Sequence, residues 1–240
     1  KDNTPLSGVE IVIKGHDEYG KTYSRTDGWF DLAINGGDVV TVEYKKEGFL
    51  PIQRQIQSPW RDYVLVDDVV MLTLDPIVTT IDLSSSLDMQ VAQGSIQADL
   101  DGERQATILF PKGLTATMTL PNGDEQPLSV LNVRATEYTV GENGSNAMPG
   151  ELPTFSGYTY AVELSVDEAI EAGATTVTFN QEIPLYVDNF LEFPVGGIVP
   201  VGWYDFETSS WVPSKNGRII KILNITDGKA ALDIDGTGTI

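Results

Sequence analysis

The chain has 240 residues and a formal net charge of −20, from 35 acidic and 15 basic side chains. So acidic a protein repels nucleic-acid phosphates and anionic membrane surfaces, and no apolar run approaches membrane-spanning length. We therefore expect no nucleic-acid partner and no membrane insertion. The absence of cysteine excludes disulfides, zinc–thiolate sites and thiol catalysis. The 23 glycines and 13 prolines, with 41% hydrophobic residues, are typical of a turn-rich, globular all-β protein.

Short apolar–polar alternations separated by turns fill the first 75 residues. Phe30, Leu32 and Ile34 fall at alternate positions, which is the period of a half-buried strand. The turn Asn35-Gly36-Gly37-Asp38 then reverses the chain into a second alternation. We expect strands over residues 9–13, 21–25, 30–34, 40–44, 52–56 and 64–74. So many short strands in 75 residues predict a β-sandwich.

A domain boundary is expected at Asp75-Pro76, because proline biases the preceding residue toward an extended conformation. Residues 76–240 are predicted to form a larger β-rich region with two sub-domains, about 76–164 and 165–240. Strands are expected over 106–110, 115–120, 128–138, 158–164, 175–179, 218–225 and 230–234, with a hairpin over 203–213 and a long loop over 141–156.

One short helix is predicted after the strand that ends near residue 164. Ser165 can cap it, Glu168 stands three residues later as a capping-box partner, and Gly173 can end it. The predicted fold is therefore all-β, with two or three tandem β-sandwich domains and one short helix.

Catalytic constellations are hard to find in this chain. His16 is the only histidine; it lies in a polar turn, and no triad partner can be identified by spacing. A zinc site needs several His or Cys ligands, which this chain lacks. A glycosidase needs two carboxyls roughly 5–10 Å apart, and the sequence singles out no such pair. We therefore predict that the protein is not an enzyme, with a glycan-active hydrolase as one alternative.

Calcium is the best cofactor candidate, although no cofactor is certain. Asp233, Asp235 and Thr237 place oxygen ligands at alternating positions in a glycine-containing loop, a spacing that suits a hard cation. Asp99, Asp101 and Glu103 form a weaker candidate of the same kind. The alternative in both cases is a solvated acidic turn.

The tryptophans are the candidate ligand-binding side chains. Trp29, Trp60, Trp203 and Trp211 are able to form a sugar-binding platform if they are exposed. In a β-sandwich, tryptophan is more often buried in the core than exposed for binding, so we expect these side chains in the core.

Two family resemblances rest on short motifs. Residues 1–75 resemble the carboxypeptidase regulatory-like domain, a small prealbumin-like sandwich, through Thr26-Asp27-Gly28-Trp29-Phe30 and Gly48-Phe49-Leu50-Pro51. The whole chain resembles the region that precedes the repeats in bacterial YD-repeat (Rhs-type, teneurin-like) proteins. The residues that carry this second resemblance include His16-Asp17-Glu18-Tyr19-Gly20, Pro59-Trp60-Arg61-Asp62-Tyr63, Arg134-Ala135-Thr136-Glu137-Tyr138 and Phe193-Pro194-Val195-Gly196-Gly197.

The second resemblance implies a non-catalytic structural module of a secreted or cell-surface bacterial protein. Such a module would support or plug a β-shell that encloses cargo or toxin, and its main partner would be the rest of its own polypeptide. The family offers no catalytic residues to carry over. The alternative is an adhesin module that binds a cell-surface glycan or protein.

Overall fold

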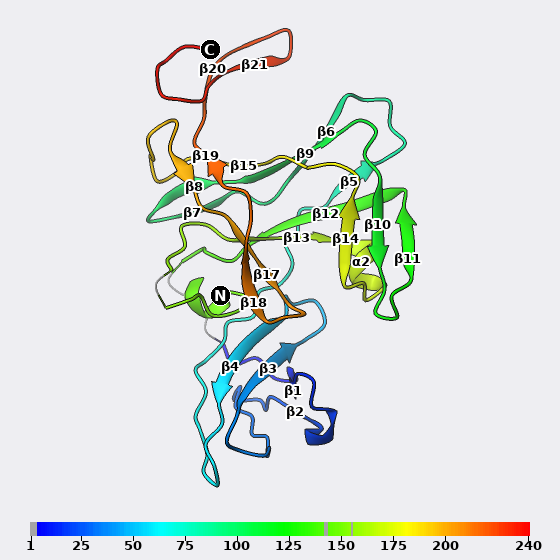
Figure 1. Cartoon of the computed structure of the whole chain (residues 1–240), viewed down its shortest axis with the longest axis vertical. Helices are drawn as coiled ribbons and strands as arrows, with labels where there is room; N and C mark the ends of the chain where they lie inside the picture. The colour runs from blue at the N-terminus through cyan, green and yellow to red at the C-terminus, as the bar shows by residue number, and fades with distance from the viewer. Residues whose placement is uncertain (1–3, 142–143, 155) are drawn as a thin grey trace.

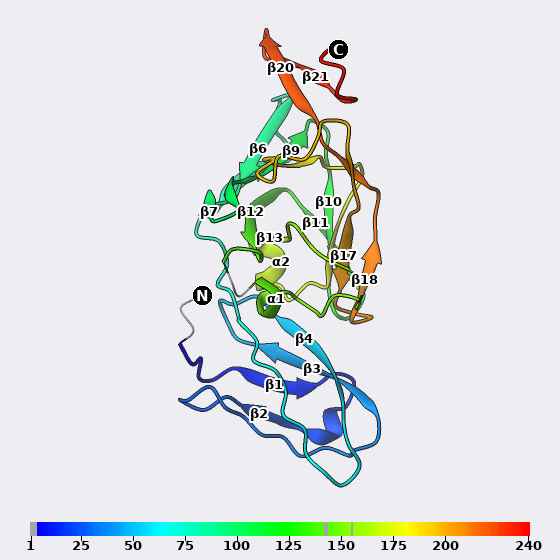
Figure 2. The same ribbon diagram turned by 90° about the vertical axis from the view of Figure 1, so that its left-hand side faces the viewer.

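The structure is a computed structural model that describes residues 4–141, 144–154 and 156–240. It is nearly all β, which confirms the predicted fold class. The molecule is elongated: a four-stranded sheet lies at one end, three further sheets lie in the middle, and a two-stranded hairpin projects at the other end (Figures 1 and 2).

The N-terminal sheet is antiparallel, with the strand order β2-β1-β3-β4. Its strands are β1 (Glu10–Ile13), β2 (Lys21–Tyr23), β3 (Val39–Lys45) and β4 (Ile52–Gln57), with the 3-10 turn η1 (Asp17–Tyr19) after β1. Alternating residues of β1 and β3 are buried on one face, as the sequence period requires. The core of this region contains Val9, Ile11, Ile13, Val40, Val42, Tyr44, Ile52 and Met71.

Two predicted strands of this region, over 30–34 and 64–74, are wrong. The burial alternation of Phe30, Leu32 and Ile34 is present, and all three pack on the sheet core. A strand also needs a backbone neighbour, and residues 30–36 pair with no described segment of the chain, so the chain runs there as an extended covering segment. Within 64–74, Thr73 makes one isolated bridge to Phe49, and no ladder forms.

The middle of the molecule contains three antiparallel three-stranded sheets, with the orders β13-β12-β5, β15-β9-β6 and β11-β10-β14. One core joins them, made of Ile81, Ala92, Ala106, Ile108, Phe110, Leu114, Ala116, Leu131, Val133 and Ala135. The strands of these sheets are β5 (Thr79–Asp82), β6 (Met89–Gln93), β9 (Ala106–Pro111), β10 (Ala116–Thr119), β11 (Glu125–Leu128), β12 (Val130–Glu137), β13 (Val162–Val166), β14 (Thr176–Phe179) and β15 (Leu185–Val187). Between β6 and β9, β7 (Gln97–Asp99) pairs with β8 (Gly102–Arg104) in a separate two-stranded ribbon.

The predicted helix exists but starts later and lacks the predicted cap. It is the single turn α2 (Asp167–Glu171), its N-cap is Val166, and no side chain of the described residues caps it. Ser165 belongs to β13, and the Glu168 carboxylate binds the backbone and side-chain nitrogens of Asn132 at 2.9 and 2.7 Å. A second helical turn, α1 (Gly144–Ala147), lies in the predicted long loop.

The C-terminal stretch consists of three two-stranded ribbons. They pair β16 (Ile198–Val199) with β19 (Gly217–Arg218), β17 (Gly202–Asp205) with β18 (Ser210–Pro213), and β20 (Lys221–Thr226) with β21 (Lys229–Asp233). The β17–β18 hairpin reaches down to the N-terminal sheet, whereas β20–β21 stands apart at the far end (Figure 1). The boundaries at residues 75 and 164 stay predictions.

Candidate functional site

The N-terminal sheet contacts the loop that carries α1, and Arg54 in β4 joins the two. The buried Arg54 guanidinium donates to the carbonyls of Met148 at 3.0 Å and Asn146 at 2.9 Å. The backbone N–H of Gln53 donates to the carbonyl of Pro149 at 2.8 Å. Burial lowers the pKa of Arg54, yet arginine remains charged, so these hydrogen bonds are charge-assisted.

The β17–β18 hairpin closes over the same sheet. The Tyr204 hydroxyl donates to Oε1 of Gln53 at 2.9 Å, and Nε2 of Gln53 donates to the carbonyl of Phe206 at 3.1 Å. Lys14 reaches the hairpin from the end of β1, donating to the carbonyl of Phe206 and, at 3.0 Å, to Oγ of Ser209. Gln53 is buried, so water cannot replace these hydrogen bonds if they break. Its polar atoms would then be left unsatisfied, which is costly.

Gly150 lets the loop and the hairpin approach closely. A Cβ at this position would lie 2.1 Å from Cε2 of Tyr204. The Tyr204 ring is itself packed edge-on against Phe206 and Trp211, at centroid distances of 5.0 and 5.4 Å. An apolar cluster lies beside this contact, with the buried residues Leu50, Leu72, Tyr138, Ala147 and Met148.

Asp75, at the predicted domain boundary, is held by side chains from the middle sheets. Its carboxylate accepts hydrogen bonds from the backbone N–H of Ser95 at 3.0 Å and the Ser95 hydroxyl at 2.8 Å. Its backbone N–H donates to Oγ1 of Thr136 at 2.8 Å. Arg134 donates to the Asp75 carbonyl at 2.8 Å and pairs with Asp167 at 2.7 Å. The connection between the two regions is therefore fixed by hydrogen bonds.

These contacts together form the interface that we take as the candidate functional site. The polar groups named above are hydrogen-bonded to one another. Their role is therefore to hold the N-terminal sheet, the α1 loop and the β17–β18 hairpin in position. Sequence reasoning missed this role for Gln53 and Arg54. One signal was available: I-Q-R-Q-I-Q over 52–57 places polar side chains on both faces of a strand, which predicts polar contacts on a second surface.

The structure brings the predicted calcium residues together in one tight turn. One carboxylate oxygen of Asp233 accepts the backbone N–H groups of Asp235 and Gly236, at 3.2 and 2.8 Å, and the other accepts that of Gly238 at 3.0 Å. Asp235 accepts both the backbone N–H and the hydroxyl of Thr237, at 3.0 and 2.8 Å. The turn thus satisfies its carboxylates from within. In the described part of the chain, no three His, Cys, Asp or Glu side chains gather to hold a metal.

Calcium at this turn remains a prediction that a thermal melt decides. A bound ion would raise the unfolding midpoint as its concentration rises above the dissociation constant. An unchanged midpoint with and without chelator would leave the loop as a hydrogen-bonded turn.

The second acidic loop contains a buried ion pair. Arg104 pairs with Asp99 at 2.6 Å and with Glu137 at 2.7 Å. Its guanidinium also lies 4.6 Å from the centroid of the Phe190 ring, which ties the loop after β15 to the middle sheets. Because Arg104 binds both oxygens of Asp99, this carboxylate has a structural role.

The free energy of unfolding is expected to depend on the ionisation of Asp99. Hydrogen bonds from Arg104 hold the pKa of Asp99 well below its usual range. The folded-state pKa is depressed, so this stabilisation is present above the unfolded pKa of about 3.9 and is lost as the pH falls through the folded pKa. Denaturant titrations from pH 6 to pH 2 should show a steeper loss for the native chain than for Asp99→Asn. Equal slopes would contradict this assignment.

The tryptophans differ from the expectation of burial. Trp29, Trp60 and Trp203 are 60%, 68% and 52% exposed, while Trp211 is half-buried and donates its indole N–H to the carbonyl of Glu151 at 3.0 Å. Turns and strand edges place the first three outside the cores. They lie in separate segments, and Trp29 lines a groove beside the N-terminal sheet.

His16 lies in an exposed turn, as expected. It stacks on Tyr19 and contacts Glu18 at 2.8 Å, so its neighbours are local in the sequence. Separately, none of the described helices is both long and apolar enough to cross a membrane.

Comparison with known proteins concerns the N-terminal region most strongly. Residues 1–71 match the family described as Teneurin TTR-like domain. The chain is 42% identical to chicken teneurin-1 over 84 residues, 35% of this chain and 3% of that protein. Over 141 residues, 57% of this chain and 5% of that protein, it is 29% identical to mouse teneurin-3. Drosophila teneurin-m is 48% identical over 52 residues, 22% of this chain and 2% of that protein.

The chain is similar to the teneurins over part of its length. It spans 3% and 5% of the length of the chicken and mouse relatives, so the relationship concerns one part of much longer proteins. The teneurin-like part of the resemblance is thereby supported. The domain that matches is the TTR-like domain; the carboxypeptidase regulatory-like assignment and the bacterial origin stay predictions.

Proposed function

We propose that the chain is a non-catalytic structural module of a larger teneurin-like YD-repeat protein, secreted or displayed at a cell surface. Its role would be to support or plug a β-shell that encloses cargo or toxin, with the rest of its own polypeptide as main partner. The teneurin similarity favours such a parent protein. The candidate interface favours a rigid support, because it fixes the N-terminal sheet against the C-terminal stretch.

The projecting β20–β21 hairpin is the observation that carries this proposal. Ile222 and Ile225 on β20 are 56% and 67% exposed, and Ile234, directly after β21, is 50% exposed. An isolated two-stranded hairpin is marginally stable in water at best. A hairpin that stands apart with exposed isoleucines therefore suits docking on a further polypeptide surface, which here would be the shell.

We expect Ile222→Lys with Ile225→Lys to weaken the contact between the module and the shell. Both side chains are already exposed, so the thermal midpoint of the 240-residue chain should stay the same. In the longer parent protein, the double variant should make the shell several-fold more sensitive to limited proteolysis, because the contact would lose the apolar surface of two isoleucines.

Thr226→Lys, on the same strand and also exposed, is the matched control. It adds a charge without removing apolar surface, so the shell should keep its protease resistance. If the double isoleucine variant left the shell as resistant as the native parent, the hairpin would not be the docking element and the proposal would lose its main support.

A further inference from the structure

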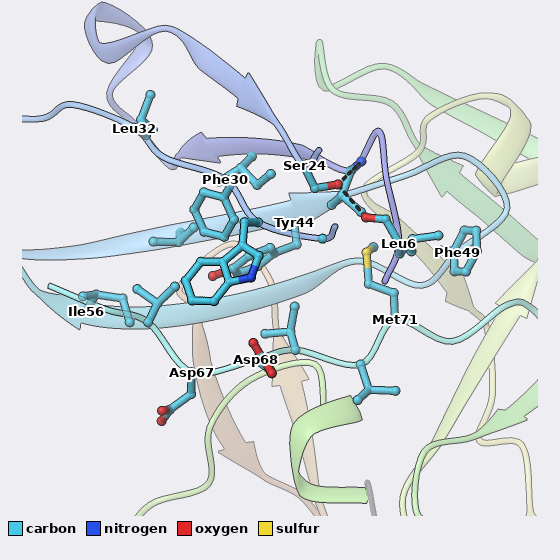
Figure 3. A pocket seen from close by; sticks show the side chains of 18 of the residues that line it. Leu6, Ser24, Phe30, Leu32, Tyr44, Phe49, Ile56, Asp67, Asp68 and Met71 are labelled. Atoms are coloured by element: carbon cyan, nitrogen blue, oxygen red, sulfur yellow. Dashed lines mark hydrogen bonds between the residues drawn. The ribbon is translucent and has the colours of Figure 1, made fainter. Parts of the chain in front are cut away.

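The apolar face of the N-terminal sheet is covered by two extended segments that form no sheet. Residues 30–36 and 64–69 make no backbone hydrogen bond to any part of the chain that the structure describes. Figure 3 shows Phe30 and Leu32 on one of these segments and Asp67 and Asp68 on the other, with Tyr44 between them. Two rows of backbone donors and acceptors therefore stand open beside an apolar floor.

A groove of about 1550 Å³ lies between the sheet and these two segments. Its floor is formed by core side chains of the sheet, including Ile11, Val42 and Tyr44. Protein interiors are close-packed, and ligand sites usually measure about 300–1,000 Å³. The groove is thus large enough to take several side chains of a partner.

One buried polar atom in the groove lacks a partner. Tyr44 is 2% exposed and lines the groove, and its hydroxyl has no hydrogen bond within the described chain. A buried hydroxyl without a partner is costly, and a ligand with a backbone N–H or C=O could satisfy it. This observation is independent of the open backbone rows and also points to a missing ligand.

The rim of the groove indicates the charge of that ligand. Asp62, Asp67 and Asp68 line the groove and are exposed, while Trp29 and Leu65 add exposed apolar surface beside them. The open backbone rows favour a ligand with an extended backbone, and the apolar floor favours apolar side chains at alternate positions of that ligand. The acidic rim favours basic side chains at the other positions. We propose that this groove binds an extended, cationic amphipathic segment of another polypeptide by β-strand addition.

The probe is a fluorescent nine-residue peptide of alternating lysine and valine, titrated into the 240-residue chain and followed by anisotropy. The same peptide with alternate backbone nitrogens methylated keeps its charge and loses hydrogen bonds. A glutamate–valine peptide reverses the charge. We expect the lysine–valine peptide to bind, and methylation to weaken binding by at least about ten-fold, since each lost hydrogen bond contributes about 1 kcal/mol.

Ala33→Pro tests the open backbone row directly. Ala33 is exposed and its N–H has no partner among the described residues, so proline removes a ladder donor without breaking a hydrogen bond that the structure shows. We expect Ala33→Pro to weaken peptide binding at least about five-fold, while Ala33→Val, which keeps the N–H, should bind within about two-fold of the native chain. Leu65→Pro and Leu65→Val form the equivalent pair on the other segment, in case one proline variant does not fold.

Asp67→Lys with Asp68→Lys should abolish the preference for the lysine peptide over the glutamate peptide. The proposal is overturned if the lysine–valine peptide does not bind at millimolar concentration. It is also overturned if methylation and the proline variants have no effect, since attraction to an acidic protein would then explain binding. Displacement of the peptide by decanoate, with no effect of the proline variants, would instead assign the groove to small apolar molecules.

Discussion

Replacing Arg104 with methionine is expected to lower the free energy of unfolding by about 3–5 kcal/mol, the usual cost of breaking a buried ion pair from one side. Arg104 is 1% exposed and is the ion-pair partner of Glu137, which is also buried. Methionine would fill much of the volume but leave the Glu137 carboxylate without its counter-charge. Urea or guanidinium unfolding followed by circular dichroism measures this change.

Two further variants separate the buried charge from simple loss of packing. Arg104→Met with Glu137→Gln removes the orphaned charge, so it should recover a substantial part of the lost stability. Lys215→Met removes the cation of the Lys215–Glu182 pair, whose side chains are both strongly exposed, and should have little effect. A double variant as unstable as Arg104→Met would show that packing, and not the uncompensated carboxylate, dominates.

The sequence predicts well those elements whose neighbours follow closely along the chain. The β17–β18 and β20–β21 hairpins have local partners, and the polar turns between them were visible. The strand expected over 128–138 is present as β12, and Leu131, Val133 and Ala135 enter the core from it. In these cases the side-chain period and the turn residues determine the structure together.

Sequence reasoning failed where the partner is distant or missing. Residues 30–34 have the period of a strand, but a period does not supply a backbone neighbour. Glu168 stands at a capping-box position, yet Asn132, 36 residues away, binds its carboxylate. The ion pair between Arg104 and Glu137, 33 residues apart, could not be predicted either. From the sequence alone, an acidic loop is interpreted as solvated, because nothing local shows that a buried arginine pairs with it.

The candidate interface shows the same limit. Contacts of Gln53 with the hairpin join residues more than 150 positions apart, and no local pattern encodes such a distance. The three exposed tryptophans were assigned to the core because burial is common for that residue type. Residue type alone does not predict whether a side chain in a turn or at a strand edge points into the core or into solvent.

Gly150→Ala is expected to destabilise the protein by about 1–3 kcal/mol, the usual cost of overpacking. The new methyl group would lie 2.1 Å from Cε2 of Tyr204 and 2.6 Å from its hydroxyl oxygen. The Tyr204 ring cannot retreat easily, since Phe206 and Trp211 pack against it and its hydroxyl binds Gln53. Denaturant unfolding gives the magnitude. Hydrogen exchange at the Gln53 amide, which bonds to Pro149, should report opening of the interface.

A double-mutant cycle with Tyr204→Leu tests whether the clash has this origin. Leucine lacks the outer ring atoms that the methyl group would meet, so Gly150→Ala should cost much less in the Tyr204→Leu background. Gly157→Ala is the matched control, because no atom lies within 4 Å of a Cβ there and the change should fall within about 0.5 kcal/mol. Additive effects of Gly150→Ala and Tyr204→Leu would mean that the loop and the hairpin are not pressed together in solution. The interface would then be too loose to hold the N-terminal sheet as a rigid support.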